Sequence, residues 1–137
     1  MHSTLFLHRR LASFLSLFLA FASFLQVVPV ALANVADTRI ALTAPPLSPG
    51  AKGSAKYRDR GGERELQVEV EVAKRLVGTV YRVLVGDAVA GQVRIDAFGR
   101  GKLTLNSRRG AVVPVVAKGT VVRVVTTDAL VVVAGKF

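Results

Sequence analysis

Two stretches of alternating apolar and polar residues flank the pair Gly61-Gly62. Before the glycines, Ala55 and Tyr57 alternate with serine, lysine and arginine, and after them leucine and valine alternate with glutamate and glutamine. A period of two is that of a β-strand with one buried face, and a Gly-Gly pair suits a two-residue hairpin turn. The pattern therefore predicts an antiparallel hairpin and restricts the chain to folds with a half-buried antiparallel sheet.

The charges next to this turn fix the register of the hairpin. If Gly61 and Gly62 form the turn, Tyr57 lies opposite Leu66 and both apolar rows share one face. The same register opposes three consecutive pairs of unlike charge, which are Arg60 with Glu63, Asp59 with Arg64, and Arg58 with Glu65. A slip of one residue would lose both patterns, so the register is strongly specified.

The rest of the chain after residue 33 has the same period and no helical periodicity. Six further strands are expected at residues 80–85, 88–95, 102–106, 112–116, 121–126 and 130–134, and residues 38–43 form one possible short strand before the first hairpin. Gly86-Asp87 suits the turn of a second hairpin. We predict an all-β fold: an antiparallel β-sandwich of immunoglobulin-like type with seven or eight short strands, and a small β-barrel as the alternative.

Residues 1–33 have the pattern of a cleavable signal peptide. Arg9 and Arg10 close a short positive region, an almost wholly apolar stretch follows, and Pro29 precedes small residues at Ala31 and Ala33. Cleavage predicts a secreted or periplasmic protein with no membrane span left in it. An uncleaved anchor is the alternative, because the apolar stretch is long enough to span a bilayer.

Two further segments follow the leader. Residues 34–50 predict a short strand followed by a proline-rich linker that contains Pro45, Pro46 and Pro49. Residues 51–137 predict the folded β-domain. The segment from residue 34 onwards is of a common size for one domain.

Cysteine is absent from the chain, and both histidines, His2 and His8, lie in the leader. This excludes thiol chemistry, cysteine-ligated metals and histidine-assisted nucleophiles from the domain. We therefore expect no cofactor, no metal site and a non-enzymatic role.

Positive charge is concentrated in the second half of the domain. Removing Arg9 and Arg10 leaves 17 Lys and Arg against 9 Asp and Glu, a net charge of +8. Residues 34–71 are balanced, so the whole excess belongs to residues 72–137. The turn residues Arg100, Lys102, Arg108 and Arg109 are the candidate anion-binding surface, and a general solubilising surface is the alternative. The expected partner is an anionic cell-envelope polymer, such as an acidic polysaccharide or lipid headgroup, or another envelope protein.

Other chemistry has weaker support. Glu69 and Glu71 point the same way from one strand, which allows a carboxylate-dependent hydrolase as an alternative, but a solvated sheet face answered by Lys52, Lys56 and Arg58 is the favoured interpretation. Asp96 could bind calcium with Asp87 or Asp128, or could stabilise a turn. Phe98, at the tip of that turn, is either a core residue or an exposed contact residue.

An oligonucleotide-binding (OB-like) barrel is a further alternative for so basic a chain. Stacking surfaces need aromatic residues, and the domain has only four, of which Tyr57 and Tyr81 fall in core positions. We therefore expect that nucleic acid is not the partner.

The turns and core positions also resemble those of a known group of proteins. The segments that carry the resemblance are residues 51–58, Gly86-Asp87, residues 96–101, Leu103, Leu105, Gly110, Val113-Pro114, Gly119 and residues 135–137. They are similar to a family of small secreted bacterial all-β domains of unassigned biochemical function. The resemblance covers nearly all of the chain after the leader and implies a shared fold and export. It carries no active-site residues to this chain, and the leading hypothesis is an exported, non-enzymatic interaction or structural module.

Overall fold

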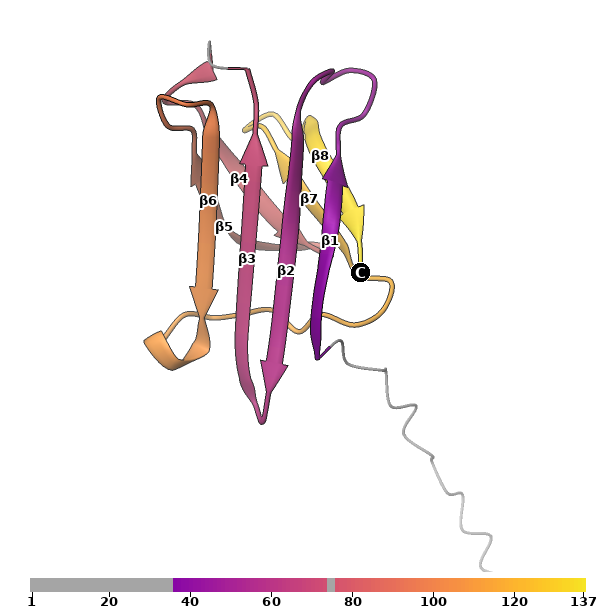
Figure 1. Cartoon of the computed structure of the whole chain (residues 1–137), viewed down its shortest axis with the longest axis vertical. Helices are drawn as coiled ribbons and strands as arrows, with labels where there is room; N and C mark the ends of the chain where they lie inside the picture. Colours follow the sequence, from indigo (N-terminus) through magenta and orange to yellow (C-terminus); the bar gives the residue numbers. More distant parts are fainter. Residues whose placement is uncertain (1–35, 74–75) are drawn as a thin grey trace, which may run out of the picture. The chain divides into compact units, whose positions relative to one another are not determined.

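A computed structural model describes residues 36–73 and 76–137. Within these ranges the chain forms eight β-strands and a 3₁₀ turn, η2 (Ser107–Arg109), with no α-helix (Figure 1). The strands are β1 (Asp37–Thr43), β2 (Lys52–Arg60), β3 (Glu63–Glu71), β4 (Val80–Val85), β5 (Ala88–Arg94), β6 (Arg100–Asn106), β7 (Val121–Val125) and β8 (Val131–Lys136). The all-β prediction and the expected number of strands are confirmed.

All eight strands belong to one antiparallel sheet in the order β5-β4-β7-β8-β1-β2-β3-β6. The sheet curls so that β1, β2, β3 and β6 form a front layer and β4, β5, β7 and β8 form a back layer (Figure 1). Thr43 of β1 opposite Ala134 of β8 joins the two layers. The architecture is therefore a nearly closed, barrel-like sheet, which is the alternative that the sequence left open beside two separate sandwich sheets.

The first hairpin has the predicted register. β2 pairs with β3 from Lys52 opposite Glu71 to Arg60 opposite Glu63, which sets all three predicted pairs of unlike charge against one another. Gly61 and Gly62 have φ values of 59° and 87°. Positive φ at both positions is what a type I′ turn requires, and it matches the right-handed twist of the flanking strands.

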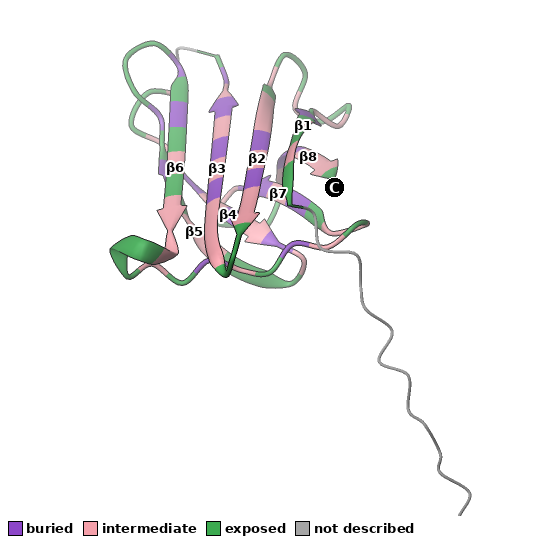
Figure 2. Ribbon diagram, turned by 60° about the horizontal axis from the view of Figure 1, so that its bottom comes forward, coloured by how far each residue is buried: buried purple, intermediate pink, exposed green. Residues whose placement is uncertain are grey.

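The core lies between the two layers and follows the alternation of the strands (Figure 2). Tyr57, Leu66 and Val68 from the front layer are fully buried, as are Val83 and Val124 from the back layer. All eight strands and the core that the structure describes lie within residues 36–137, so the chain from Asn34 onwards contains every element of this sheet that the structure describes.

β1 belongs to the sheet and lies between β8 and β2. It pairs with β2 over its whole length, from Asp37 opposite Arg58 to Thr43 opposite Lys52. The proline-rich residues that follow connect β1 to β2 through a turn in which the Ser48 N–H donates to the Pro45 carbonyl at 2.9 Å.

Residues 112–116 do not form the strand that their valines predicted. Pro114 has no N–H to contribute to a ladder, and the burial period here is three, since Val113 and Val116 are buried whereas Val112 and Val115 are exposed. The segment crosses the lower end of the sheet in Figure 1. Its valines therefore close one end of the core without pairing in the sheet.

β5 and β6 lie at the two ends of the strand order and meet at a seam. A methyl group added to Gly91 would lie 3.0 Å from Leu103 Cδ1, and one added to Gly101 would lie 3.1 Å from Ile95 Cδ1 and deep inside contact with Val93 Cγ1. The two glycines therefore allow the edge strands to approach closely. Side-chain packing holds this seam together.

Among the described residues, no helix has the length and apolar character needed to cross a membrane. The predicted signal peptide at residues 1–33 lies outside the described residues.

Candidate functional site

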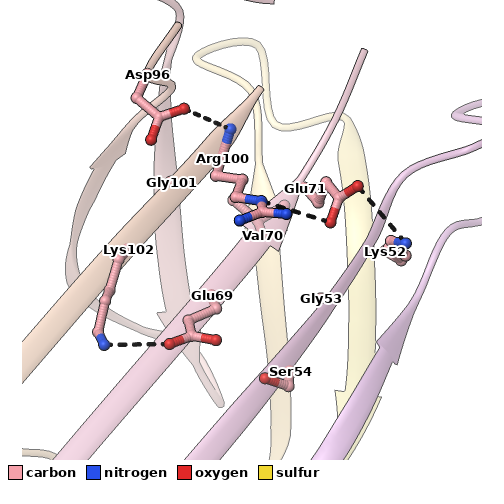
Figure 3. Close-up of a pocket in the computed structure, with 10 residues that line it drawn as sticks. All are labelled: Lys52, Gly53, Ser54, Glu69, Val70, Glu71, Asp96, Arg100, Gly101 and Lys102. Carbon is pink, nitrogen blue, oxygen red and sulfur yellow. Dashed lines mark hydrogen bonds and ion pairs between the residues drawn. The ribbon is translucent and has the colours of Figure 1, made fainter. Parts of the chain in front are cut away.

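A shallow depression of about 500 Å³ lies on the outside of the front layer, between the upper parts of β2, β3 and β6 (Figure 3). Charged side chains line most of it. They are Lys52 from β2, Glu69 and Glu71 from β3, Asp96 from the β5–β6 turn, and Arg100 and Lys102 from β6.

Each glutamate in the depression lies between two cations. The Glu71 carboxylate is 3.6 Å from Lys52 Nζ and 3.9 Å from Arg100 Nε. The Glu69 carboxylate is 3.1 Å from Lys102 Nζ and 3.8 Å from Arg39 Nη2. A catalytic general acid, in contrast, lies in an apolar and largely buried site. Both side chains are also about half exposed, so this geometry favours a solvated ion-pair surface over a hydrolase site.

The four residues of the predicted anion-binding surface do not lie together. Arg100 and Lys102 are at the upper end of β6, whereas Arg108 and Arg109 follow its lower end in η2. The seven residues of β6 rise by about 3.3 Å each, which separates the two pairs by roughly 20 Å. The structure therefore divides the predicted surface into two small clusters.

Three of these four cations also have carboxylate partners. Arg100 pairs with Glu71, Lys102 with Glu69, and Arg108 with Glu63. Arg109 forms no ion pair with any described residue. The sequence missed this because the partners lie on β3, and the β3–β6 register that opposes Glu69 to Lys102 joins residues distant in the chain.

Cations with no carboxylate in the same strands lie on the outer side of the back layer, which we call the cationic face. Its members are Arg82 of β4, Arg94 of β5, Arg123 of β7 and Lys136 of β8, and each of the three arginines adjoins buried core residues on its strand. Asp87, in the β4–β5 turn, lies 3.7 Å from Arg123 Nη2. Within residues 36–73 and 76–137, Arg82, Arg94 and Lys136 form no ion pair.

Backbone carbonyls hold two of the arginines of the cationic face in place. Arg82 Nη2 donates to the Thr127 carbonyl at 2.8 Å, and Arg123 Nη2 donates to the Gly86 carbonyl at 3.0 Å. These acceptors are neutral, so the charge of Arg82 has no carboxylate partner among the described residues, whereas Arg123 also has Asp87. The sequence placed these residues in strands but gave no reason to group them, because their proximity depends on β4–β7 pairing.

The front layer has the opposite character on its outer side. Its outward residues are polar apart from Ala41, and cations alternate with carboxylates across neighbouring strands. Asp37, for example, lies 3.5 Å from Arg58 Nε and 3.3 Å from Arg60 Nη2. The strands of the front layer therefore carry eight cations among six carboxylates, whereas the strands of the back layer carry four cations and no carboxylate.

Asp96 stabilises its turn, which was one of the two interpretations of its sequence position. Its Oδ1 accepts hydrogen bonds from the N–H groups of Phe98, at 2.8 Å, and Arg100, at 3.0 Å. Asp87 is in the β4–β5 turn and Asp128 in the β7–β8 turn, so they belong to opposite ends of the sheet. The described part of the chain holds no group of three acidic or other metal-binding side chains.

The aromatic residues are unsuited to stacking on bases. Tyr57 and Tyr81 are buried, and burial raises the pKa of both phenols. Phe137 packs edge-on against Tyr57 with ring centroids 6.3 Å apart. Phe98 is 71% exposed, so of its two interpretations the core residue is excluded and the exposed residue is left. One exposed aromatic among the described residues does not provide the row of rings that single-stranded nucleic acid uses.

Comparisons with protein-family models, curated proteins and solved structures find no match to this chain.

Proposed function

We propose that this chain is an exported, non-enzymatic interaction module that binds an anionic polymer of the cell envelope through the cationic face. The observation that carries the proposal is the separation of charge between the two layers. The carboxylates of β3 pair with cations of β2 and β6, whereas β4, β5, β7 and β8 carry four cations and no carboxylate within the strands. An exposed field of one sign attracts a ligand of the opposite sign.

The spacing of the cations suits a ligand with repeated charges. Arg82 lies opposite Val125 and Arg123 lies opposite Leu84, so the two arginines are diagonal neighbours on adjacent strands. Diagonal neighbours on one face of a sheet are about 7–8 Å apart. Arg94 and Lys136 extend the row across the two outer strands of the layer. An acidic polysaccharide can contact several such charges at once.

Export is part of the same proposal and rests on the leader. Intact-mass analysis of the secreted or periplasmic protein is expected to find a chain that begins at Asn34. A cell-bound form that retains residues 1–33 would contradict cleavage.

Retention on an immobilised polyuronate tests the binding surface. The test variant replaces Arg82, Arg94, Arg123 and Lys136 by Gln, and the control replaces Arg100, Lys102, Arg108 and Arg109 by Gln, so both lose four charges. The test variant is expected to elute at clearly lower salt than the control, because three of the control cations are already paired.

Two results would overturn this assignment. Equal losses would mean that net charge alone governs retention, and a larger loss in the control would return the site to the residues of β6 and η2. Because Arg82 and Arg123 also bond to backbone carbonyls, thermal unfolding of each variant must accompany the assay. The double variant Arg94→Gln with Lys136→Gln avoids those bonds and is expected to show part of the same shift.

A further inference from the structure

Four connections lie at the upper end of the barrel in Figure 1, and each carries one exposed large apolar side chain. The four residues, which we call the apolar tips, are Leu47 (89% exposed) between β1 and β2, Val77 (51%) between β3 and β4, Phe98 (71%) between β5 and β6, and Leu130 (62%) between β7 and β8. Because odd-numbered strands all run toward this end, the antiparallel order brings the four connections together.

Hydrogen-bonded turns hold the tips outward. The Phe98 N–H donates to the Asp96 carboxylate at 2.8 Å, and the Leu130 N–H donates to Thr126 Oγ1 at 3.1 Å. Ala129, just before Leu130, has a φ of 65°, a left-handed conformation that costs a non-glycine residue energy. Specific hydrogen bonds therefore fix the two connections that carry Phe98 and Leu130, and a strained residue precedes Leu130.

The opposite end differs. Its β2–β3 turn consists of Gly61-Gly62 between charged residues, and its β4–β5 turn is Gly86-Asp87. Exposed Val112 and Val115 at that end both belong to the one segment whose other valines close the core, and exposed Val89 and Val121 lie within strands β5 and β7, outside the connections. A separate apolar tip on every connection is thus a property of the upper end.

Positive charge adjoins the apolar tips. Arg94 ends β5 at this end, and Arg82 reaches the Thr127 carbonyl in the β7–β8 turn. Neither arginine pairs with a carboxylate among the described residues, while two carboxylates, Asp96 and Asp128, lie in the β5–β6 and β7–β8 connections themselves. The apolar tips thus lie beside the upper edge of the cationic face.

We propose that the apolar tips insert into the surface of an anionic lipid bilayer, with Arg82 and Arg94 at the level of the headgroups. Apolar side chains that enter the acyl boundary and cations that meet anionic headgroups add their contributions to binding. The tips come from separate connections with polar residues such as Ser48 and Asp128 between them. Each of these tips can enter the acyl boundary of a bilayer separately from the others.

This inference goes beyond the proposed function, because an acidic polysaccharide has no need of apolar tips. The two share Arg82 and Arg94 but differ in Leu47, Val77, Phe98 and Leu130. Binding to vesicles and retention on a polyuronate can therefore succeed or fail separately.

Sedimentation with vesicles of phosphatidylcholine and phosphatidylglycerol tests the inference with the chain from Asn34 onwards. Leu47→Ser, Phe98→Ser and Leu130→Ser are each expected to lower the partition coefficient by about tenfold, the effect of removing one inserted side chain. The control Val112→Ser with Val115→Ser removes exposed apolar groups at the other end and is expected to bind as the parent does. Vesicles of phosphatidylcholine alone are expected to bind more weakly.

The absence of tryptophan offers a second readout that does not depend on stability. Phe98→Trp is expected to show a blue-shifted emission with vesicles and quenching by brominated lipid, and Val112→Trp is expected to show neither. Failure of the parent to bind, equal losses in tip and control variants, or equal quenching at both positions would overturn the inference, whatever the polyuronate column shows.

Discussion

Gly101→Ala would place a single methyl group in the seam between β5 and β6, at a position where the added carbon has no free space. The added carbon would overlap Val93 Cγ1 and lie 3.1 Å from Ile95 Cδ1 and 3.2 Å from the Arg94 carbonyl oxygen. The φ of Gly101 is not positive, so backbone conformation does not oppose the substitution. Steric overlap therefore decides the sign of the effect.

The expected cost follows from two opposing contributions. Overpacking a dense core typically costs about 1–3 kcal/mol, and the lower entropy of the unfolded alanine chain returns roughly 0.4–1 kcal/mol. We expect a net loss of about 1–2 kcal/mol. For a domain of this size that lowers the melting temperature by roughly 4–16 °C.

A double-mutant cycle with Val93→Ala tests the cause. Val93 is fully buried, so Val93→Ala alone is expected to cost about 2–3 kcal/mol through lost burial and a cavity. In the double variant the new methyl group fills part of that cavity, so the combined loss is expected to be smaller than the sum by about 1 kcal/mol or more. Urea unfolding gives all four free energies.

Thr104→Ala is the matched control on the outward side of β6, and it is expected to change stability by less than about 0.5 kcal/mol. Additive losses from Gly101→Ala and Val93→Ala would refute the reasoning, since they would show that the two side chains do not compete for the same space. A stabilised Gly101→Ala would refute the close approach of the two edge strands altogether.

Three further predictions concern other parts of the fold. Because burial raises the pKa of Tyr81, the folded state favours the protonated phenol. The stabilisation from this group is therefore expected to be complete below about pH 10 and to fall as the pH rises further. Tyr81→Phe is expected to reduce that fall when unfolding is measured at alkaline pH. Asp96→Ala is expected to lose about 1–2 kcal/mol in thermal unfolding as two N–H groups lose their acceptor, whereas Asp96→Asn keeps an acceptor oxygen and is expected to lose less; equal losses would contradict this role. In double-mutant cycles Arg58 is expected to couple to Asp37 by about 0.2–1 kcal/mol and more weakly to Glu65, because Arg58 forms its ion pair with Asp37 of β1. A stronger coupling between Arg58 and Glu65 would contradict this assignment of the ion pair.

Local patterns predicted the elements whose partners are close in the sequence. The Gly61-Gly62 hairpin was predicted residue for residue, because turn chemistry, alternation and opposed charges all depend on neighbours along the chain. The expected strand at residues 112–116 was wrong, because valine content alone does not provide the ladder that Pro114 interrupts.

The candidate site was harder to predict for a related reason. A charge count assigned the positive excess to the second half of the chain, but β6 folds against the acidic β3 and loses that excess. The cationic face arises from β4–β7 pairing between residues about 40 positions apart, as in Arg82 opposite Val125. The residue types were visible in the sequence, whereas their neighbours depend on the order of strands in the sheet.

The seam leaves β5 and β6 as edge strands, so one side of each lacks a ladder partner within the sheet. Such edges can recruit a strand from another molecule, and proteins guard them with lysines and bulges. Here β6 carries Lys102, and the β4–β5 register is broken between Val83 and Leu84. These devices act against intermolecular pairing, so the domain is expected to depend on them for colloidal stability in concentrated solution. Loss of Lys102 is expected to favour domain-swapped polymers, and a measurement of the free energy of unfolding alone would not detect this effect.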